Sequence, residues 1–221
     1  GVNTIDVEAA NQRGIYVTNC PGKNSAAVAE LAIGLLIACD RRIVSATNEL
    51  RSGQWRKKEY GKARGLRGRT LGIIGVGMIG KEVIRRAQGL GMHVAAWSRS
   101  LNETIASELG VTYCASPLEV ARCSDAVSIH VAAAAETNKL VGREFLDALK
   151  HGAILVNAAR GEVVDRDALV DAIQRKGLRV GLDVFADEPK PGEAPFEDTQ
   201  LAQLVTATPH IGASTDEASE A

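Results

Sequence analysis

The sequence predicts an α/β fold, a doubly wound parallel sheet, and three observations support this prediction. Short β-rich runs alternate with helical patterns from about Leu71 onward, and such alternation is typical of right-handed βαβ crossovers. Some runs are apolar throughout, as in Ala153–Val156, which is expected of strands that helices cover on both faces. The first run leads through a glycine-rich turn, Gly75–Gly80, directly into a helical pattern.

The elements after residue 70 follow in order. We expect strands at Leu71–Ile74, His93–Trp97, Ala126–Val131, Ala153–Ala158, Leu178–Val184 and Leu204–Thr208. Helical patterns lie between them at Ile79–Leu90, Glu103–Leu109, Arg143–Leu149 and Asp167–Lys176. With 221 residues, the chain is long enough to bury the core that such a sheet requires.

The first seventy residues have a different pattern. Gly14–Asn19 is expected to form a short strand that ends at the Pro21–Gly22 turn. Ser25 is expected to cap one long helix, which runs from Ala26 to about Leu50. The polar, basic stretch Arg51–Arg69 contains three glycines and is predicted to be a loop.

The composition is that of a soluble globular protein and argues against several partners. The net charge is −1, so no broad positive field attracts nucleic acid or an anionic membrane. The longest apolar run, Leu31–Cys39, is too short to span a bilayer. The four cysteines form no C-x-x-C pair and no metal-finger spacing, so we expect reduced thiols in a cytoplasmic protein and no metal site.

The Gly75–Gly80 turn has the G-x-G-x-x-G pattern in the strand–turn–helix context of a dinucleotide-binding (Rossmann) fold. Gly75 permits the sharp turn, Gly77 leaves the backbone open to a pyrophosphate, and Gly80 allows close packing of helix on strand. The helix start at Met78 and Ile79 offers free N–H groups and a positive dipole end to the phosphates. A tight glycine turn without a ligand is the alternative interpretation.

The end of the second strand bears on the choice of cofactor. NAD-specific folds usually place Asp or Glu there to accept from the ribose 2′-OH, but this chain has Ser98 and Arg99. A hydroxyl and a guanidinium suit a 2′-phosphate, so the sequence favours NADP over NAD. The alternative is that Arg99 is only solvated and NAD binds without an acidic partner.

Several segments together resemble the D-isomer-specific 2-hydroxyacid dehydrogenase family, which includes phosphoglycerate dehydrogenase and glyoxylate/hydroxypyruvate reductase. These are Asn157–Asp165, Gly181–Pro189 and Thr208–Thr215, taken with Gly75–Gly80 and the early Asn19–Glu30 pattern. Each segment is moderately specific alone. In this order and spacing they are highly specific, and the resemblance covers nearly the whole chain.

The resemblance implies a catalytic set of Arg160, Glu188 and His210. His210 would be the acid/base at the C2 oxygen, Glu188 would orient its ring, and Arg160 would bind the substrate carboxylate or carbonyl. Asp183 would contact the nicotinamide carboxamide. The resemblance places these residues at the cofactor: Val131, Ala158, Ala159, Arg160, Asp183, His210, Gly212 and Ala213.

The resemblance also implies a domain division and an oligomeric state. Gly1–Asp6 resembles the end of the family's substrate-binding domain, so we expect residues 1–22 to be a remnant of it and residues 23–221 to be the dinucleotide-binding domain. The family's final helix is expected to be cut within Ser214–Ala221, which makes the chain a fragment, weakly active or inactive alone. The long helix near residues 26–50 is expected to form a homodimer.

Some features leave alternatives open. The family usually has proline where this chain has Ala132, so we expect a looser loop at the adenine. His130 ends a strand near the cofactor but has no evident carboxylate partner, while His93 and His151 are expected to be ordinary strand-end residues. We predict an NAD(P)-dependent oxidoreductase acting on small 2-hydroxy or 2-keto acids. A corepressor-like dinucleotide sensor is the alternative, and formate- or phosphite-type oxidation is a lesser one.

Overall fold

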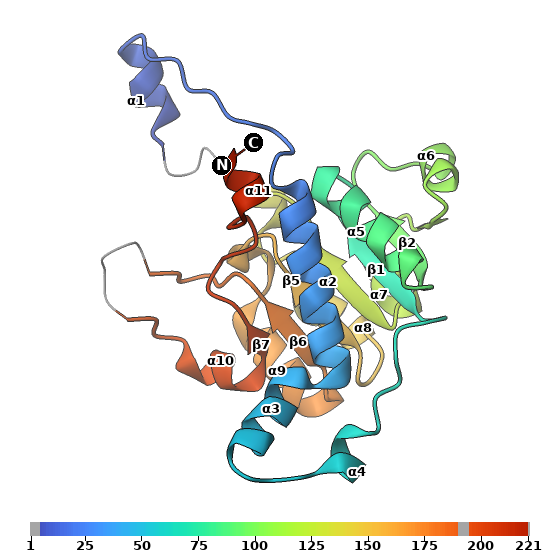
Figure 1. Ribbon diagram of the computed structural model, residues 1–221. Coiled ribbons are helices and arrows are strands. Elements are labelled where there is room, and N and C mark those ends of the chain that lie inside the picture. Colours follow the sequence, from blue (N-terminus) through green and yellow to red (C-terminus); the bar gives the residue numbers. More distant parts are fainter. Residues whose placement is uncertain (1–4, 190–194, 221) are drawn as a thin grey trace.

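Seven parallel strands form a single sheet in the computed structural model, which describes residues 5–189 and 195–220 (Figure 1). Their order across the sheet is β3-β2-β1-β4-β5-β6-β7. The strand order runs outward in both directions from the β1–β4 pair, so the direction of strand order reverses there. Doubly wound sheets bind ligands at this point. The strands are β1 (Thr70–Ile74), β2 (His93–Trp97), β3 (Thr112–Tyr113), β4 (Ala126–Ile129), β5 (Ile154–Asn157), β6 (Arg179–Leu182) and β7 (Thr206–Ala207).

Helices cover both faces of this sheet (Figure 1). On one face lie α2 (Ser25–Arg41) and α5 (Met78–Gly89), and on the other lie α7 (Pro117–Cys123), α8 (Arg143–Ala148) and α9 (Arg166–Lys176). The core is accordingly split in two layers: Ile154 and Val156 of β5 belong to the layer under α2 and α5, whereas Leu155 belongs to the other. The doubly wound prediction is confirmed.

Shorter helical segments lie around the edges of the described structure. They are α1 (Val7–Gln12), α3 (Ile43–Arg51), α4 (Lys57–Tyr60), α6 (Glu103–Glu108), α10 (Thr199–Leu204) and α11 (Asp216–Glu220), with 3₁₀ turns at η1 (Ala135–Thr137) and η2 (Gly161–Val163). Helix α1 and the pair α3–α4 project from opposite ends of the molecule (Figure 1). Within the described ranges, no helix is both long and apolar enough to cross a membrane.

All six predicted strands and all four predicted helices after residue 70 are present, with small shifts at their ends. Besides the 3₁₀ turns η1 and η2, one strand and two helices were not predicted there. Strand β3 has only two residues at the sheet edge, and α10 begins within a polar stretch. Helix α7 had a readable signal: Ser116 caps it, Pro117 occupies its first turn, and Glu119 reaches back to the Ala115 N–H.

The prediction of one helix from Ala26 to Leu50 is wrong, as is the prediction that Ser25 caps it. Asn24 precedes the first helical residue, Ser25, and the chain breaks at Arg42, which has a left-handed φ of 51°. Arg42 turns there because its guanidinium binds the Glu59 carbonyl and lies 4.5 Å from the centre of the Tyr60 ring. Contacts to α4, which lies inside the predicted 51–69 loop, therefore outweigh the local helical preference.

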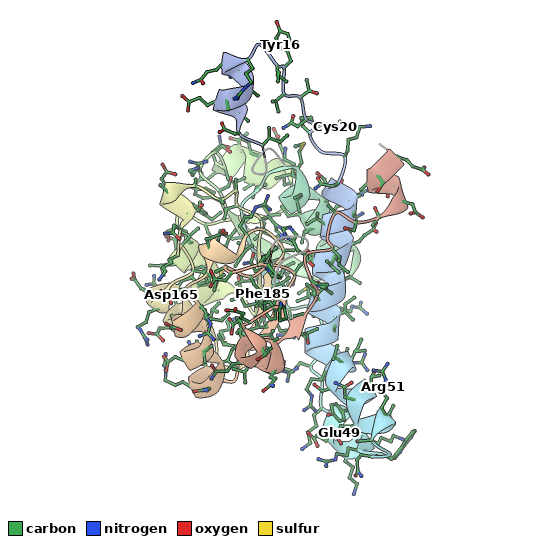
Figure 2. The ribbon with its side chains drawn as sticks, turned by 90° about the vertical axis from the view of Figure 1, so that its left-hand side faces the viewer. Tyr16, Cys20, Glu49, Arg51, Asp165 and Phe185 are labelled. Carbon is green, nitrogen blue, oxygen red and sulfur yellow. The ribbon has the colours of Figure 1, made fainter. Side chains whose placement is uncertain are left out.

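The predicted strand at Gly14–Asn19 is also wrong. No strand of the described residues pairs with it, and an unpaired strand leaves its backbone groups to water. Tyr16 is 95% exposed and points away from the body of the molecule (Figure 2). The domain prediction depends on the segment Gly1–Asp6. Residues 1–4 of this segment lie outside the described residues.

Candidate active site at the carboxyl edge of the sheet

The Gly75–Gly80 turn connects β1 to α5 and forms the centre of the edge. Gly75 has φ of 101°, and a Cβ there would lie 2.6 Å from the His130 carbonyl oxygen, so the β1 and β4 ends approach more closely than any side chain permits. A Cβ on Gly80 would collide with the Gly75 carbonyl, whereas one on Gly77 would meet nothing within 4 Å. The space over the helix N-terminus is therefore open at Gly77.

A cavity of about 340 Å³ lies beside this turn at the ends of β1 and β2, and we call it the β1–β2 cavity. Its lining includes five residues predicted to bind the cofactor: Gly75, Gly77, Ser98, Arg99 and Val131. The Ser98 hydroxyl is buried and makes no hydrogen bond within the described residues. Arg99 is exposed and forms no ion pair in that same part of the chain. A polar ligand in this cavity would have two uncommitted donors to meet.

The loop after β4 forms the far wall of the β1–β2 cavity. We expected a looser loop there because the chain has Ala132 in place of proline. The Thr137 hydroxyl donates to the Ala132 carbonyl at 2.7 Å and accepts from the Ala134 N–H at 2.8 Å. One buried hydroxyl therefore closes the alanine-rich segment on itself.

A second cavity of about 390 Å³ lies at the ends of β4, β5 and β6, and we call it the β4–β6 cavity. It adjoins the first, because Val131 and Ala132 line both. Nine residues predicted to bind cofactor or substrate line it: Ile79, Val131, Ala158, Ala159, Arg160, Asp183, His210, Gly212 and Ala213. Of the other predicted residues, Met78 lies against Gly22, Gly80 is buried under the turn, and Glu188 lies behind His210.

His210, which lines the β4–β6 cavity, forms a hydrogen-bonded pair with Glu188. His210 Nδ1 lies 2.6 Å from Glu188 Oε2, and Glu188 Oε1 accepts from the Phe185 N–H at 3.0 Å. Both carboxylate oxygens are thereby engaged, which fixes the plane of the carboxylate. Since Nδ1 meets a carboxylate, it carries the ring proton, and Nε2 is the nitrogen left for a ligand. The predicted pairing of these side chains is present.

Two buried side chains at strand ends hold the loops that carry Arg160 and His210. Asn157, which is 1% exposed, accepts from the Ala159 N–H at 3.0 Å and donates to the Arg160 carbonyl at 2.9 Å. Asp183, also 1% exposed, holds the loop at His210 in the same way. The sequence indicated neither brace, because nothing in the local pattern distinguishes them from ordinary strand-end polar residues.

The two braced loops also pack directly on each other. A Cβ on Gly161 would collide with the backbone of Phe185, so η2 and the loop after β6 are in contact (Phe185 is labelled in Figure 2). Arg160 Nη1 donates to the Ala159 carbonyl at 2.7 Å, which turns the guanidinium over its own loop. Arg160 and His210 therefore lie on one rigid edge and both border the β4–β6 cavity.

Two polar residues of this cavity, Asn24 and His130, were not assigned a role from the sequence. Asn24, just before α2, lines the cavity and makes no capping hydrogen bond. His130 bonds Ser128 Oγ through Nε2 at 2.8 Å, and its buried Nδ1 has no partner among the residues the structure describes. Burial lowers the pKa of His130 to about 4, so the ring is neutral near pH 7.

The residues present fit a dinucleotide. The two adjoining cavities lie on either side of the α5 N-terminus, where Gly77 leaves open space and the first helical N–H groups have no helical acceptor. The Ser98 hydroxyl, which makes no hydrogen bond within the described residues, is a donor open to a ligand in the β1–β2 cavity. No group of three or more His, Cys, Asp or Glu side chains gathers as a metal site among the residues the structure describes.

Comparisons with known proteins agree with this geometry. Residues 33–212 match the family model described as "D-isomer specific 2-hydroxyacid dehydrogenase, NAD binding domain". The chain is 42% identical to glyoxylate reductase from Thermococcus litoralis, over 100% of this chain and 67% of that protein. It is 40% identical to D-3-phosphoglycerate dehydrogenase from Methanocaldococcus jannaschii, of which it spans only 41%. The solved structure of Aquifex aeolicus D-lactate dehydrogenase with NAD and lactic acid matches with a TM-score of 0.86 at 32% identity, covering 100% of this chain and 69% of that one.

Proposed function

The chain belongs to the D-isomer-specific 2-hydroxyacid dehydrogenase family, and we propose that it carries the cofactor site and acid/base pair of an enzyme that interconverts small D-2-hydroxy acids and 2-keto acids. The hydrogen-bonded His210–Glu188 pair carries this proposal, because His210 lines the same cavity as Arg160. We further propose that residues 23–221 are the dinucleotide-binding domain and residues 1–22 belong to the substrate-binding domain.

Each of these three side chains has a distinct task in this proposal. His210 Nε2 gives a proton to the substrate's C2 oxygen during reduction and takes it back during oxidation. Glu188 holds the proton on Nδ1 and stabilises the charged ring. Arg160 binds the substrate carboxylate with a planar pair of N–H donors. A bound nicotinamide supplies or accepts the hydride, and Ala158, Ala159 and Asp183 would line its pocket.

The decisive experiment measures reduction of hydroxypyruvate, glyoxylate and 3-phosphohydroxypyruvate by the full-length protein. His210→Gln should lower kcat by about 10³-fold, the usual effect of losing an acid/base. His151→Gln is the matched control, since His151 is exposed just before β5, at the opposite edge of the sheet. Equal rates for the two variants would contradict the proposal. Cofactor binding without any turnover would support a sensing protein instead.

We also propose that the cofactor site, which belongs to a family model described as NAD binding, takes NADP(H) or NAD(H) and favours NADP(H). Ser98 and Arg99 provide a hydroxyl and a positive charge where a 2′-phosphate would lie, and no Asp or Glu follows β2 directly. Trp97 lines the same cavity and reports binding by fluorescence, with Trp55→Phe removing the only other tryptophan. Arg99→Gln should weaken NADPH binding about tenfold and leave NADH nearly unchanged. Tighter binding of NADH by the unmodified protein would overturn this preference.

A homodimer through the α3–α4 arm is a further part of the proposal. None of the residues in α3 or α4 is buried, and Ile43, Val44, Leu50 and Trp55 expose apolar surface, Trp55 to 80%. The arm stands well away from the body, with Glu49 and Arg51 at its end (Figure 2). Leu50→Glu should convert a dimer to a monomer in light scattering, while Leu90→Glu, on the α5 side of the molecule, should not.

A further inference from the structure

Asp183 lies one residue beyond β6 and makes four hydrogen bonds to the loop that carries His210. Its Oδ1 accepts from Thr208 Oγ1 at 2.6 Å and from the Ile211 N–H at 2.9 Å. Its Oδ2 accepts from the Gly212 N–H at 2.9 Å. Its backbone carbonyl accepts from the His210 N–H at 2.8 Å. One residue therefore contacts the chain on both sides of His210 and at His210 itself.

Hydrogen bonds from this loop stabilise the buried carboxylate of Asp183. The side chain is 1% exposed, and no Lys, Arg or His forms an ion pair with it within residues 5–189 and 195–220. A buried carboxylate is costly unless hydrogen-bond donors surround it, and the loop supplies all three donors that the structure shows. The carboxylate and the loop conformation therefore stabilise each other.

The loop itself has a conformation that needs such support. His210 has φ of 54°, in the left-handed region that non-glycine residues seldom occupy. Two residues later, a Cβ on Gly212 would lie 2.8 Å from Asp183 Oδ2, so only glycine fits against the carboxylate. The chain is thus wound closely around Asp183, and the backbone of His210 takes the left-handed conformation within it.

We propose that Asp183 is a positioning residue that holds His210 in its left-handed turn, so that Nδ1 meets Glu188 while the ring remains at the β4–β6 cavity. This role is separate from the contact with the nicotinamide that the family resemblance implies for Asp183. The importance of the turn for catalysis rests on the proposed function of His210. The role of Asp183 in holding the turn does not depend on that function. Experiments can therefore contradict the positioning role and the proposed reaction separately.

Asp183→Asn in the full-length protein tests the proposal. The asparagine keeps the shape of the side chain but places an NH₂ group where a donor of the His210 loop needs an acceptor. NMR follows the hydrogen-bonded Nδ1 proton of His210. Its signal is assigned because it is absent from the spectrum of His210→Gln. Amide exchange follows Ile211 and Gly212. We expect the proton signal to disappear and amide exchange at both positions to rise by about tenfold or more. Asp187→Asn, exposed in the same segment, should change neither measurement.

The outcomes separate the possible roles. An unchanged His210 signal together with weaker cofactor binding would overturn the proposal and leave Asp183 as a cofactor contact only. If Asp183→Asn does not fold, Thr208→Val removes a single donor, and faster exchange at Ile211 with the native melting temperature supports the same role. Unchanged exchange in that variant would contradict it. If the signals respond but His210→Gln leaves kcat unchanged, the positioning role holds and the proposed reaction fails.

Discussion

The two halves of the carboxyl edge are built by different means. In the β1–β2 half, the backbone forms the site: a glycine turn, the open space at Gly77 and the N-terminus of α5. In the β4–β6 half, side chains form it, and buried Asn157 and Asp183 hold the loops that present Arg160 and His210. Phosphates are recognised well by backbone N–H groups, whereas proton transfer requires a side chain at a defined position.

This difference predicts how each half responds to substitution. A site made of backbone is sensitive to added atoms, because a single methyl group blocks the approach of chain or ligand. A site made of braced side chains is sensitive to removed atoms, because each lost hydrogen bond leaves a buried partner unsatisfied.

Gly80→Ala should cause the largest loss of stability in the backbone half. The new methyl group would collide with the Gly75 carbonyl, and forcing the turn open should cost about 3 kcal/mol in the free energy of unfolding. That cost exceeds the gain in helix propensity of about 1 kcal/mol. Urea denaturation measures this change in the free energy of unfolding. Gly77→Ala is the control, since its methyl group meets nothing within 4 Å: it should keep native stability yet weaken NADPH binding. Equal stability of the two variants would break the contrast.

Asn157→Ala should damage the side-chain half without affecting the other. Loss of the bonds to Ala159 and Arg160 should lower kcat/KM for the 2-keto acid about 30-fold, or about 2 kcal/mol. The dissociation constant of NADPH should change little, because the glycine turn is untouched. Asn157→Asp keeps the acceptor for Ala159 but places a buried carboxylate oxygen against the Arg160 carbonyl, so it should lose at least as much as Asn157→Ala. Parallel losses in cofactor affinity and turnover would show that the halves are not independent.

The same contrast explains what the sequence could predict. The six residues of the glycine turn act locally, so their spacing alone indicates the conformation. Arg160, Glu188 and His210 were located only by resemblance to a family, because they are brought together by strand order. The braces Asn157 and Asp183 act through loop backbone, and nothing in the sequence reveals which N–H groups a buried oxygen accepts.

The errors in the first part of the chain have a related cause. Arg42 lies in a helical pattern, yet its distant contacts with Glu59 and Tyr60 break the helix there. Gly14–Asn19 has the composition of a strand but no neighbouring strand among the described residues. Both cases show tertiary contacts, or the lack of them, overriding local propensity.

His130 joins the two halves and should make the fold sensitive to acid. Its carbonyl lies against Gly75, while its ring lines the β4–β6 cavity. Burial lowers the pKa of His130 in the folded protein from 6.5 to about 4. Below pH 6.5, His130 of the unfolded chain therefore binds a proton that the folded chain does not bind. From pH 7.5 to 5.5, the free energy of unfolding should therefore fall by about 1 kcal/mol. His130→Gln should remove this part of the pH dependence in urea titrations; an identical slope would contradict it.

Ser98→Ala should have the smallest effect, and it tests whether the backbone half is completed by a side chain after all. The Ser98 hydroxyl is buried without a partner in the described residues, so its removal leaves nothing unsatisfied and should not lower the melting temperature. If this hydroxyl binds the 2′-phosphate, NADPH should bind about threefold more weakly and NADH should be unaffected. Ser100→Ala, in the exposed part of the same cavity wall, is the control. Equal losses for both cofactors would place Ser98 at the adenosine in general, and discrimination between NADPH and NADH would then depend on Arg99 alone.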